Sequence, residues 1–442
     1  MHSTSLQDRV TILELAEAGL NDGVIAERLG LSLATVRKWR RRGQRRGRPG
    51  LVSRLGRPPT GALSSFPSTV RDTLQAWRQQ HPGWGPCTLH AQACGTPALA
   101  DQRLPKRATL AHWLKEQHLT RSYQRHRELP QPLGEIAQAA HEAWEMDAYG
   151  AVRVPEVGMI NLINLNDCFS RVKLLSFPCW VGAQRVSRHP NTADYLLVLR
   201  LAFWHWGLPG QLRVDRDSIY FDNASQSPFP TQLHLFLLGL AIDLVIGPAH
   251  QPRYRAITER SHQTWDQQVL AGQRFTDWEA LWRALEARRD FLNRELPCRG
   301  SDDLPPLCAH PQAAVARRPY TPVQEPTLFD VERIYTYLSQ GQWFRKASNV
   351  AVVTLGAQHY GLDQAWAKHE VQITFDLADR CLVFLDQDGQ QTKRRPIKGI
   401  TYTELAGEMG RLFELHPCQL ALPLSWPEQR VIRLSETLGD TN

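Results

Sequence analysis

The chain has 442 residues, of which 42% are hydrophobic and 14 are tryptophan, which is enough for about three domains with buried cores. Its formal net charge is +8. The eight cysteines include no C-x-x-C pair, which argues against both a disulfide framework and a cysteine zinc site. The chain has no apolar signal core at its start and no run of roughly 18 apolar residues, so we expect a cytoplasmic protein without a membrane partner.

Positive charge is concentrated near the N-terminus. Between Arg28 and Arg57 there are eleven Arg or Lys residues and no Asp or Glu. A surface with so many cations and no nearby anion favours a polyanionic partner. The alternative is a solvated charged face on a bundle that binds protein.

Residues 1–44 carry three short helical patterns, at 6–18, 22–29 and 32–42. Their apolar residues are spaced to converge on one small core: Ile12, Leu15, Val24, Ile25, Leu29, Val36 and Trp39. We therefore predict a three-helix helix-turn-helix domain. The third helix of such a domain enters the major groove, which makes its basic residues candidates for DNA contacts: Arg37, Lys38, Arg40, Arg41 and Arg42.

A basic segment rich in Gly and Pro follows at residues 45–66. The sequence Arg45-Arg-Gly-Arg-Pro49 looks like the centre of an AT-hook, an extended segment whose arginines, here Arg46 and Arg48, lie in a narrow minor groove. Leu55-Gly-Arg-Pro-Pro59 is a second basic stretch of this kind. A flexible basic linker is the alternative interpretation.

Residues 67–125 have a second set of helical patterns. Val70, Leu74 and Trp77 space one helix, and Leu110, Trp113 and Leu114 space another. The arrangement is consistent with a second helix-turn-helix-like domain that contacts DNA. The alternative is a purely structural spacer.

The central segment, 135–296, alternates strand and helix patterns. A short strand carries Asp147 and two further strands follow; a helix then leads to a strand that ends on Asp215, and a later helix carries Glu259. This is the order of the ribonuclease H-like α/β fold. Two Asp on strands and one Glu on a helix make an oxygen ligand set that suits Mg²⁺ or Mn²⁺ rather than zinc.

Four motifs in this segment together resemble the integrase core of DDE transposases, and most of all the transposases of bacterial insertion sequences that are related to retroviral integrases. In chain order they are Trp144-Glu-Met-Asp147, Asp167-Cys-Phe-Ser-Arg171, Gly207-Leu-Pro209 with Val214-Asp215-Arg-Asp217, and Pro252-Arg-Tyr-Arg-Ala-Ile-Thr-Glu259-Arg260. The helix-turn-helix patterns ahead of the core fit the same family.

The resemblance implies a DNA transposase that binds the terminal repeats of its element, cleaves the 3′ ends and transfers them into target DNA. It implies two Mg²⁺ ions, or Mn²⁺, with Asp147 bridging them and Asp215 and Glu259 each holding one. It also implies a homo-oligomer on double-stranded DNA at a prokaryotic nucleoid, by a cut-and-paste or a copy-out route. Arg253, Arg255 and Arg260 flank the Glu and could meet phosphates.

The sequence departs from the family at the second carboxylate. Most relatives have Asp-Asn-Gly there, whereas this chain has Asp215-Arg-Asp217, and the gap from Asp215 to Glu259 is longer than usual. Asp217 and Asp222 therefore remain alternatives to Asp215. We expect Asp167 and Arg171 to have structural roles, since a tight turn between strands needs side-chain hydrogen bonds. Rival functions are a catalytically silent DNA-binding scaffold and a hydrolytic nuclease of the same fold.

The C-terminal third changes character. Residues 297–342 are rich in Pro and predict an extended linker. Short strand patterns at 343–405 predict a small β-barrel, in which Lys393, Arg394 and Arg395 either follow a DNA backbone or form a solvated edge strand. Residues 406–442 are a tail. The predicted architecture is therefore multidomain: all-α helix-turn-helix modules, an α/β ribonuclease H-like integrase core and a β-barrel.

Overall fold

The computed structural model describes residues 4–52, 61–120, 136–180, 189–223, 225–247, 256–386, 388–409 and 412. The chain divides into two units, one formed by residues 1–67 with 108–120 and the other by 68–107 with 121–442. Each unit is described by itself. No helix among the described residues has the length and apolar character needed to cross a bilayer.

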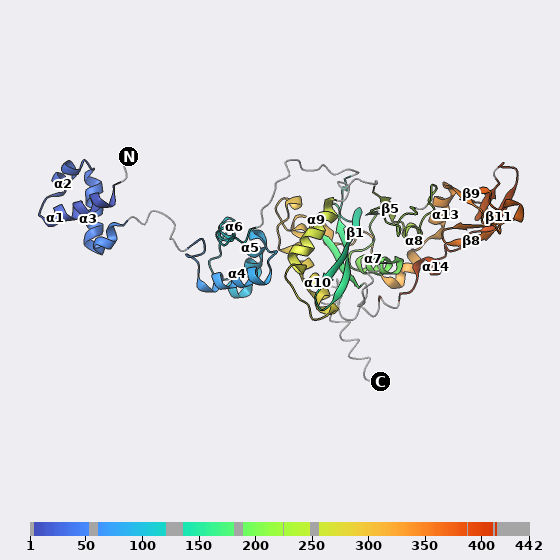
Figure 1. Cartoon of the computed structure of the whole chain (residues 1–442), viewed down its shortest axis with the longest axis horizontal. Helices are drawn as coiled ribbons and strands as arrows, with labels where there is room; N and C mark the ends of the chain where they lie inside the picture. Colours follow the sequence, from blue (N-terminus) through green and yellow to red (C-terminus); the bar gives the residue numbers. More distant parts are fainter. Residues whose placement is uncertain are drawn as a thin grey trace, which may run out of the picture. The chain divides into compact units, whose positions relative to one another are not determined.

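The first unit begins with the predicted three-helix domain, α1 (Leu6–Glu17), α2 (Asp22–Leu29) and α3 (Leu33–Arg46) (Figure 1). Each helix begins at a capping residue, since the Ser5, Asn21 and Ser32 side chains accept hydrogen bonds from backbone N–H groups of the first turn. Its buried core contains Ile12, Ile25, Ala26, Val36, Trp39 and Leu51. The prediction that Val24 belongs to this core is wrong, because Val24 is 46% exposed on the outer face of α2.

The AT-hook prediction at residues 45–49 is also wrong. Arg46 is the last residue of α3, and a 3₁₀ turn, η1 (Arg48–Leu51), follows it. Leu51 is fully buried in the three-helix core, and the Arg9 Nη1 donates a 2.8 Å hydrogen bond to its carbonyl oxygen. This apolar anchor makes the segment helical rather than extended. Residues 55–59 lie outside the described residues.

The predicted second helical module contains α4 (Ser68–Gln80), α5 (Pro86–Gly95), the short turn η2 (Pro97–Leu99) and α6 (Arg107–Glu116). The connection between α4 and α5 packs on the central domain. There the Trp84 indole N–H donates to the Gln268 carbonyl at 3.2 Å, and the Arg288 guanidinium lies 4.2 Å from the Trp84 ring centroid. Gly83 permits this approach, because a Cβ there would lie 2.0 Å from the Gln267 carbonyl oxygen.

The central domain is built on a five-stranded sheet in the order β3-β2-β1-β4-β5. Its strands are β1 (Ala143–Val154), β2 (Gly158–Asp167), β3 (Lys173–Trp180), β4 (Gln211–Val214) and β5 (Asp243–Ile246). β1, β2 and β3 are antiparallel, whereas β4 runs parallel to both β1 and β5. This order and these directions are those of the ribonuclease H-like fold, as the sequence predicts.

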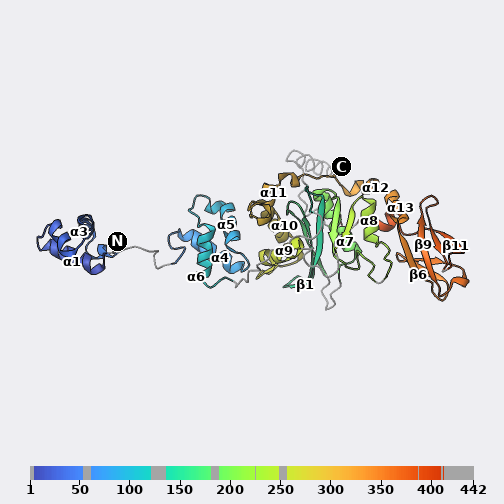
Figure 2. The same ribbon diagram turned by 90° about the horizontal axis from the view of Figure 1, so that it is seen from above.

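Helices cover both faces of this sheet (Figures 1 and 2). On one face, α7 (Thr192–Trp206) and α8 (Gln232–Gly239) pack on Trp144, Met146 and other buried residues of one large core. On the other face lie α9 (Ala256–Trp265), the π-helical turn η4 (Asp266–Leu270) and α10 (Trp278–Arg294), which bury Ile160 and Leu162. Successive side chains of a strand alternate between the two faces.

Residues 297–342 are folded, so the predicted extended linker is wrong. They form the 3₁₀ turns η5 (Arg299–Ser301), η6 (Pro311–Ala314) and η7 (Pro322–Gln324) and the helices α11 (Pro306–Ala309), α12 (Glu325–Leu328) and α13 (Val331–Ser339). Proline suits the first positions of such helices, where no N–H is needed. Apolar residues of this segment, among them Tyr320, Ile334 and Leu338, join the large core.

A buried ion pair fastens this segment to the central domain. Arg200 of α7 is 2% exposed at its side chain and Glu325 of α12 is 0% exposed. The Arg200 Nε and Nη2 donate to the two carboxylate oxygens at 2.9 and 2.7 Å. The Tyr402 hydroxyl donates to the same carboxylate at 3.0 Å, and the Tyr320 hydroxyl also contacts it. Each carboxylate oxygen thus accepts more than one hydrogen bond.

The C-terminal region is mainly β, as predicted, but the closed barrel is not confirmed. The strands β6 (Gln342–Lys346), β9 (Glu370–Asp376), β10 (Cys381–Leu385) and β11 (Thr392–Pro396) form an antiparallel sheet in the order β11-β10-β9-β6. A separate hairpin pairs β7 (Val352–Leu355) with β8 (Gln358–Gly361). The short turn η8 (Gln364–Trp366) and the helix α14 (Tyr402–Ala406) complete the described region; residues 413–442 lie outside it.

Candidate functional site

Asp147 lies on β1, and Asp215 directly follows the neighbouring strand β4. β1 and β4 are parallel, and Glu145 is the ladder partner of Arg213. Asp147 is two residues beyond Glu145, and Asp215 is two residues beyond Arg213. Because the side-chain period of a strand is two, this register directs both carboxylates to the same face of the sheet. Asp147 lies in the first half of β1, whereas Asp215 directly follows the carboxyl end of β4, and ligands of open α/β sheets commonly bind at such ends.

A buried tyrosine provides a second link between the two carboxylates. Burial raises the pKa of Tyr195 on α7, and the nearby negative charges of Asp217, Asp147 and Asp215 raise the pKa further. Burial also raises the pKa of Tyr220, whose ring lies 5.4 Å from that of Tyr195, and Asp215 and Asp147 act on it in the same direction. Both carboxylates therefore act electrostatically on one pair of buried phenol groups.

The helix that carries Glu259 crosses the same face of β1. The Glu145 Oε1 accepts a hydrogen bond from the Thr258 N–H at 2.9 Å and another from the Thr258 hydroxyl. One turn further along α9, the His262 Nε2 lies 4.0 Å from the Asp147 Oδ2, and the His262 ring stacks on Tyr149. Glu259 directly follows Thr258 and is exposed.

These three predicted ligands do not form a closed metal-binding group. Among the residues that the structure describes, no three His, Cys, Asp or Glu side chains are grouped so that they could hold an ion. The structure thus directs Asp147 and Asp215 to one face of the sheet, on β1 and directly after the neighbouring strand β4. It places Glu259 on the helix beside them, without bringing its carboxylate into one cluster with theirs.

The two alternatives to Asp215 have contacts of their own. The Asp217 Oδ1 accepts hydrogen bonds from the Ile219 N–H and the Ser218 hydroxyl, both at 3.1 Å, which close a tight turn. The Asp217 N–H in turn donates to the Asp215 Oδ1 at 3.1 Å. Asp217 therefore supports the turn that follows β4.

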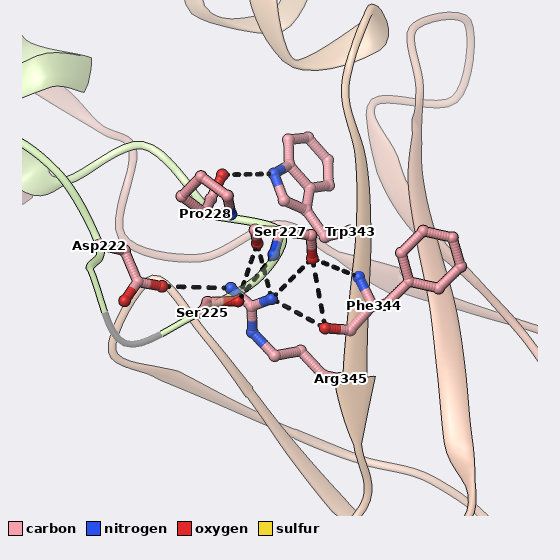
Figure 3. A network of polar contacts seen from close by, with 7 residues as sticks. All are labelled: Asp222, Ser225, Ser227, Pro228, Trp343, Phe344 and Arg345. Carbon is pink, nitrogen blue, oxygen red and sulfur yellow. Dashed lines mark hydrogen bonds and ion pairs between the residues drawn. The ribbon is translucent and has the colours of Figure 1, made fainter. Parts of the chain in front are cut away.

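Asp222 points to the C-terminal sheet (Figure 3). Its Oδ2 lies 3.4 Å from the Arg345 Nη2 on β6. Beside this ion pair, the Phe344 N–H donates to the Ser227 hydroxyl at 2.7 Å, and the Trp343 indole N–H donates to the Pro228 carbonyl at 3.2 Å. Asp222 is thus part of a polar contact between the loop after β4 and strand β6.

The basic residues of α3 are partly neutralised by acids from the other helices. Asp22 on α2 lies 2.7 Å from Arg40 and 3.8 Å from Arg37, and Glu14 on α1 lies 3.5 Å from Arg48. The cations of Lys38 and Arg42 lie 5.4 and 5.2 Å from the Trp39 ring centroid. Within the described part of the chain, Arg41 and Arg46 are exposed and have no carboxylate partner.

The basic residues of β11 are also engaged. The Lys393 ammonium lies 2.7 Å from an Asp363 oxygen, and the Arg394 guanidinium contacts both Asp376 and Asp379. The Arg395 Nε donates to the Gly361 carbonyl at 3.1 Å. These partners weaken the prediction that the strand follows a DNA backbone.

The basic residues around Glu259 are only partly described. Arg260 is exposed, and its Nη1 donates to the Gln263 amide oxygen at 3.1 Å. Arg253 and Arg255 lie outside the described residues.

Sequence analysis found the role of Asp167 but missed Glu145. Asp167 is fully buried, and its oxygens accept hydrogen bonds from the His141 N–H at 2.8 Å and from the Ser170 N–H at 2.7 Å. This confirms its structural role. Glu145 is 4% exposed, and burial raises its pKa although the Thr258 hydrogen bonds oppose this. The available signal was its spacing of two from Asp147, which puts both acids on one face of β1.

Comparisons with known proteins identify the first domain. Residues 3–52 match the family model described as a homeodomain-like domain, and no curated protein matches the chain. Among solved structures, the simian T-cell lymphotropic virus intasome with the PP2A regulatory subunit B56 gamma is 15% identical, with a TM-score of 0.31, over 71% of this chain and 97% of that one.

Two further solved structures are integrase catalytic core domains. That of HTLV-2, in complex with magnesium, is 12% identical with a TM-score of 0.29, over 39% of this chain and 98% of that one. That of BIV is 13% identical with a TM-score of 0.27, over 39% of this chain and 96% of that one. Since these scores are low, the fold follows from the strand order given above. The chain has an N-terminal homeodomain-like helix-turn-helix domain and a central α/β domain with ribonuclease H-like topology.

Proposed function

We propose that this protein is a DNA transposase that binds the ends of a mobile element, cleaves the 3′ ends and transfers them into target DNA. The observation that carries the proposal is the register of two neighbouring parallel strands, which directs Asp147 on β1 and Asp215 directly after β4 to one face of the sheet. It occurs in a chain that also has a homeodomain-like helix-turn-helix domain.

The chemistry of the three carboxylates suits hard divalent cations, although the structure does not gather them into one group. Two carboxylates on one face of a sheet edge, with a third on the adjoining helix, offer only oxygen ligands, which Mg²⁺ and Mn²⁺ prefer. In the proposal Asp147, Asp215 and Glu259 would together hold two such ions, and Asp147 would be the ligand shared by both. The ions would stabilise the charge that develops on the entering and leaving oxygens during phosphodiester cleavage and joining. The contacts of Asp217 and Asp222 support Asp215 as the second ligand.

The other domains are assigned to DNA and assembly. In the proposal α3 enters the major groove of the terminal repeat, and exposed cations such as Arg41 and Arg46 meet phosphates. The second helical module, residues 67–125, and the C-terminal sheet, 343–405, would add DNA contacts near the core. The active form would be a homo-oligomer on double-stranded DNA, since two element ends are processed together.

The substitution Asp147→Asn tests the chemistry. The variant should bind a duplex of the element's end as the unchanged protein does, and should lose cleavage in Mg²⁺ or Mn²⁺, because an amide is a poor ligand for these ions. Asp222→Asn is the matched control and should retain cleavage, since Asp222 contacts Arg345.

The outcomes separate the three functions. Equal cleavage by the Asp147→Asn variant and the unchanged protein would exclude the assigned mechanism. Cleavage by the unchanged protein without any joined product would identify a hydrolytic nuclease. Binding without cleavage under all metal conditions would identify a silent scaffold.

A further inference from the structure

We propose that Glu145 is a positioning residue, which fixes the first turn of α9 on β1 and thereby places Glu259 beside Asp147. This inference rests on the proposed function for its consequence in catalysis. Its structural part concerns only the contact between a strand and a helix.

The direct contact is a buried carboxylate at the start of a helix. Glu145 is 4% exposed and Thr258 is 0% exposed. The Glu145 Oε1 accepts a 2.9 Å hydrogen bond from the Thr258 N–H and a second one from the Thr258 hydroxyl. The N–H groups of a first helical turn have no partner inside the helix. A carboxylate at that end also interacts favourably with the helix dipole.

A second polar contact holds the same helix one turn later. The Ser261 hydroxyl donates to the Asn166 Oδ1 at 3.1 Å, and Ser261 is fully buried. Asn166 is the ladder partner of Glu145 on β2. The Lys173 ammonium on β3 donates to the same Asn166 oxygen at 2.9 Å. Glu145, Asn166 and Lys173 therefore form a polar row across three strands beneath α9.

Two anchors three residues apart determine how α9 is rotated. Thr258 and Ser261 both face the sheet, and Glu259 lies between them in sequence on the exposed flank. Hydrogen bonds depend on direction, whereas apolar contacts allow a helix to slide or turn. A rotation of α9 that broke the Glu145 contact would carry the Glu259 carboxylate around the helix axis with it. Mutation of a residue that hydrogen-bonds to a metal ligand and orients it commonly lowers metal affinity or activity by about 10–100-fold.

Glu145 itself is a poor candidate for a metal ligand. Its Oε1 already accepts two hydrogen bonds from Thr258. Its contacts are with protein groups, which is consistent with positioning rather than with direct contact to the reacting atoms.

Three variants of the full chain test the inference. Glu145→Leu removes the acceptor, Glu145→Gln keeps an oxygen that can accept from Thr258, and Thr258→Val removes only the hydroxyl donor. Asn293→Ala is the matched control. Asn293 is 1% exposed and bonds the backbone of Lys173, so its loss removes a buried polar contact of α10 instead.

The first readout is hydrogen exchange of the backbone amides in residues 257–261. Glu145→Leu should speed this exchange at least about tenfold, and Glu145→Gln and Thr258→Val should have smaller effects. Asn293→Ala should leave it unchanged. Unchanged exchange in Glu145→Leu, or equal acceleration in Asn293→Ala, would overturn the inference whatever the protein's activity.

The second readout is the Mn²⁺ concentration that gives half-maximal cleavage of an element-end duplex. It should rise about 10–100-fold in Glu145→Leu, with DNA binding unchanged and with partial rescue in Glu145→Gln. A normal Mn²⁺ dependence in Glu145→Leu despite faster exchange would show that the contact does not position Glu259. If the unchanged protein cleaves nothing, the proposed function fails and the exchange experiment still decides the structural contact.

Discussion

The substitution Glu325→Ala should destabilise the central domain strongly. Glu325 is fully buried, and its carboxylate accepts hydrogen bonds from Arg200, Tyr320 and Tyr402. In this variant the buried Arg200 guanidinium would lose its carboxylate partner and keep its 2.7 Å hydrogen bond to the Ala406 carbonyl oxygen. Breaking a buried ion pair by removing one partner costs about 3–5 kcal/mol. For a domain of this size each kcal/mol lowers the unfolding midpoint by about 2–4 °C, so we expect a fall of about 6–20 °C.

Thermal unfolding followed by near-ultraviolet circular dichroism measures this change. Glu332→Ala is the matched control, because Glu332 forms an exposed ion pair with Arg380 at 2.8 Å, and such pairs contribute little. The double variant Arg200→Met, Glu325→Leu should recover most of the loss, since no buried charge then remains unpaired. A midpoint for Glu325→Ala no lower than that of Glu332→Ala would refute the reasoning.

Two further predictions concern acid stability and DNA binding. Burial lowers the pKa of His234 from 6.5 to about 4. The neutral, buried imidazole therefore contributes its full stability above pH 6.5, the pKa in the unfolded state, and this contribution is lost as the pH falls toward the folded-state pKa of about 4. By about pH 5 this lowers the free energy of unfolding by about 2 kcal/mol. Urea unfolding at about pH 7.5 and at about pH 5 gives the decrease in that free energy for each protein, and the decrease should be about 2 kcal/mol smaller in His234→Phe than in the unchanged protein. An equal drop in both proteins would contradict this. Arg41→Gln should weaken DNA binding and reduce the slope of log affinity against log salt by about 0.9, as measured by fluorescence anisotropy. Arg40→Gln, whose arginine already pairs with Asp22, should reduce that slope less, and an equal reduction would show that the Asp22 pair opens on DNA.

The features that the sequence predicted well depend on local patterns. Strand and helix periodicities gave the order of the central domain and the position of Asp215 at the end of a short strand, while its role as a ligand stays a prediction. The parallel register of β1 and β4 then places Asp147 at the matching position. The spacing of apolar residues gave the three helices of the first domain.

The features that it missed depend on contacts between distant residues. The stretch from Arg28 to Arg57 has no acid, but the fold brings Asp22 and Glu14 to its arginines from other helices. Glu145 meets Thr258 from 113 positions away. Local sequence does not contain such pairings, because they follow from how the elements pack.

Proline content misled the prediction for residues 297–342. Proline is typical of extended linkers, but it also suits the first turn of short helices. Only the burial of the intervening residues, such as Tyr320 and Ile334, distinguishes the two cases.

The folded state of residues 297–342 limits how far the C-terminal sheet can travel. As an extended tether, this stretch would span about 150 Å at about 3.3 Å per residue. Wrapped on the core and held there by Arg200, it keeps β6 against the loop that follows Asp215. In the proposed transposase, the C-terminal sheet therefore contacts the DNA that is bound at the catalytic centre of the same chain. Spanning the gap to the opposite end of the element is then the task of a second copy of the chain.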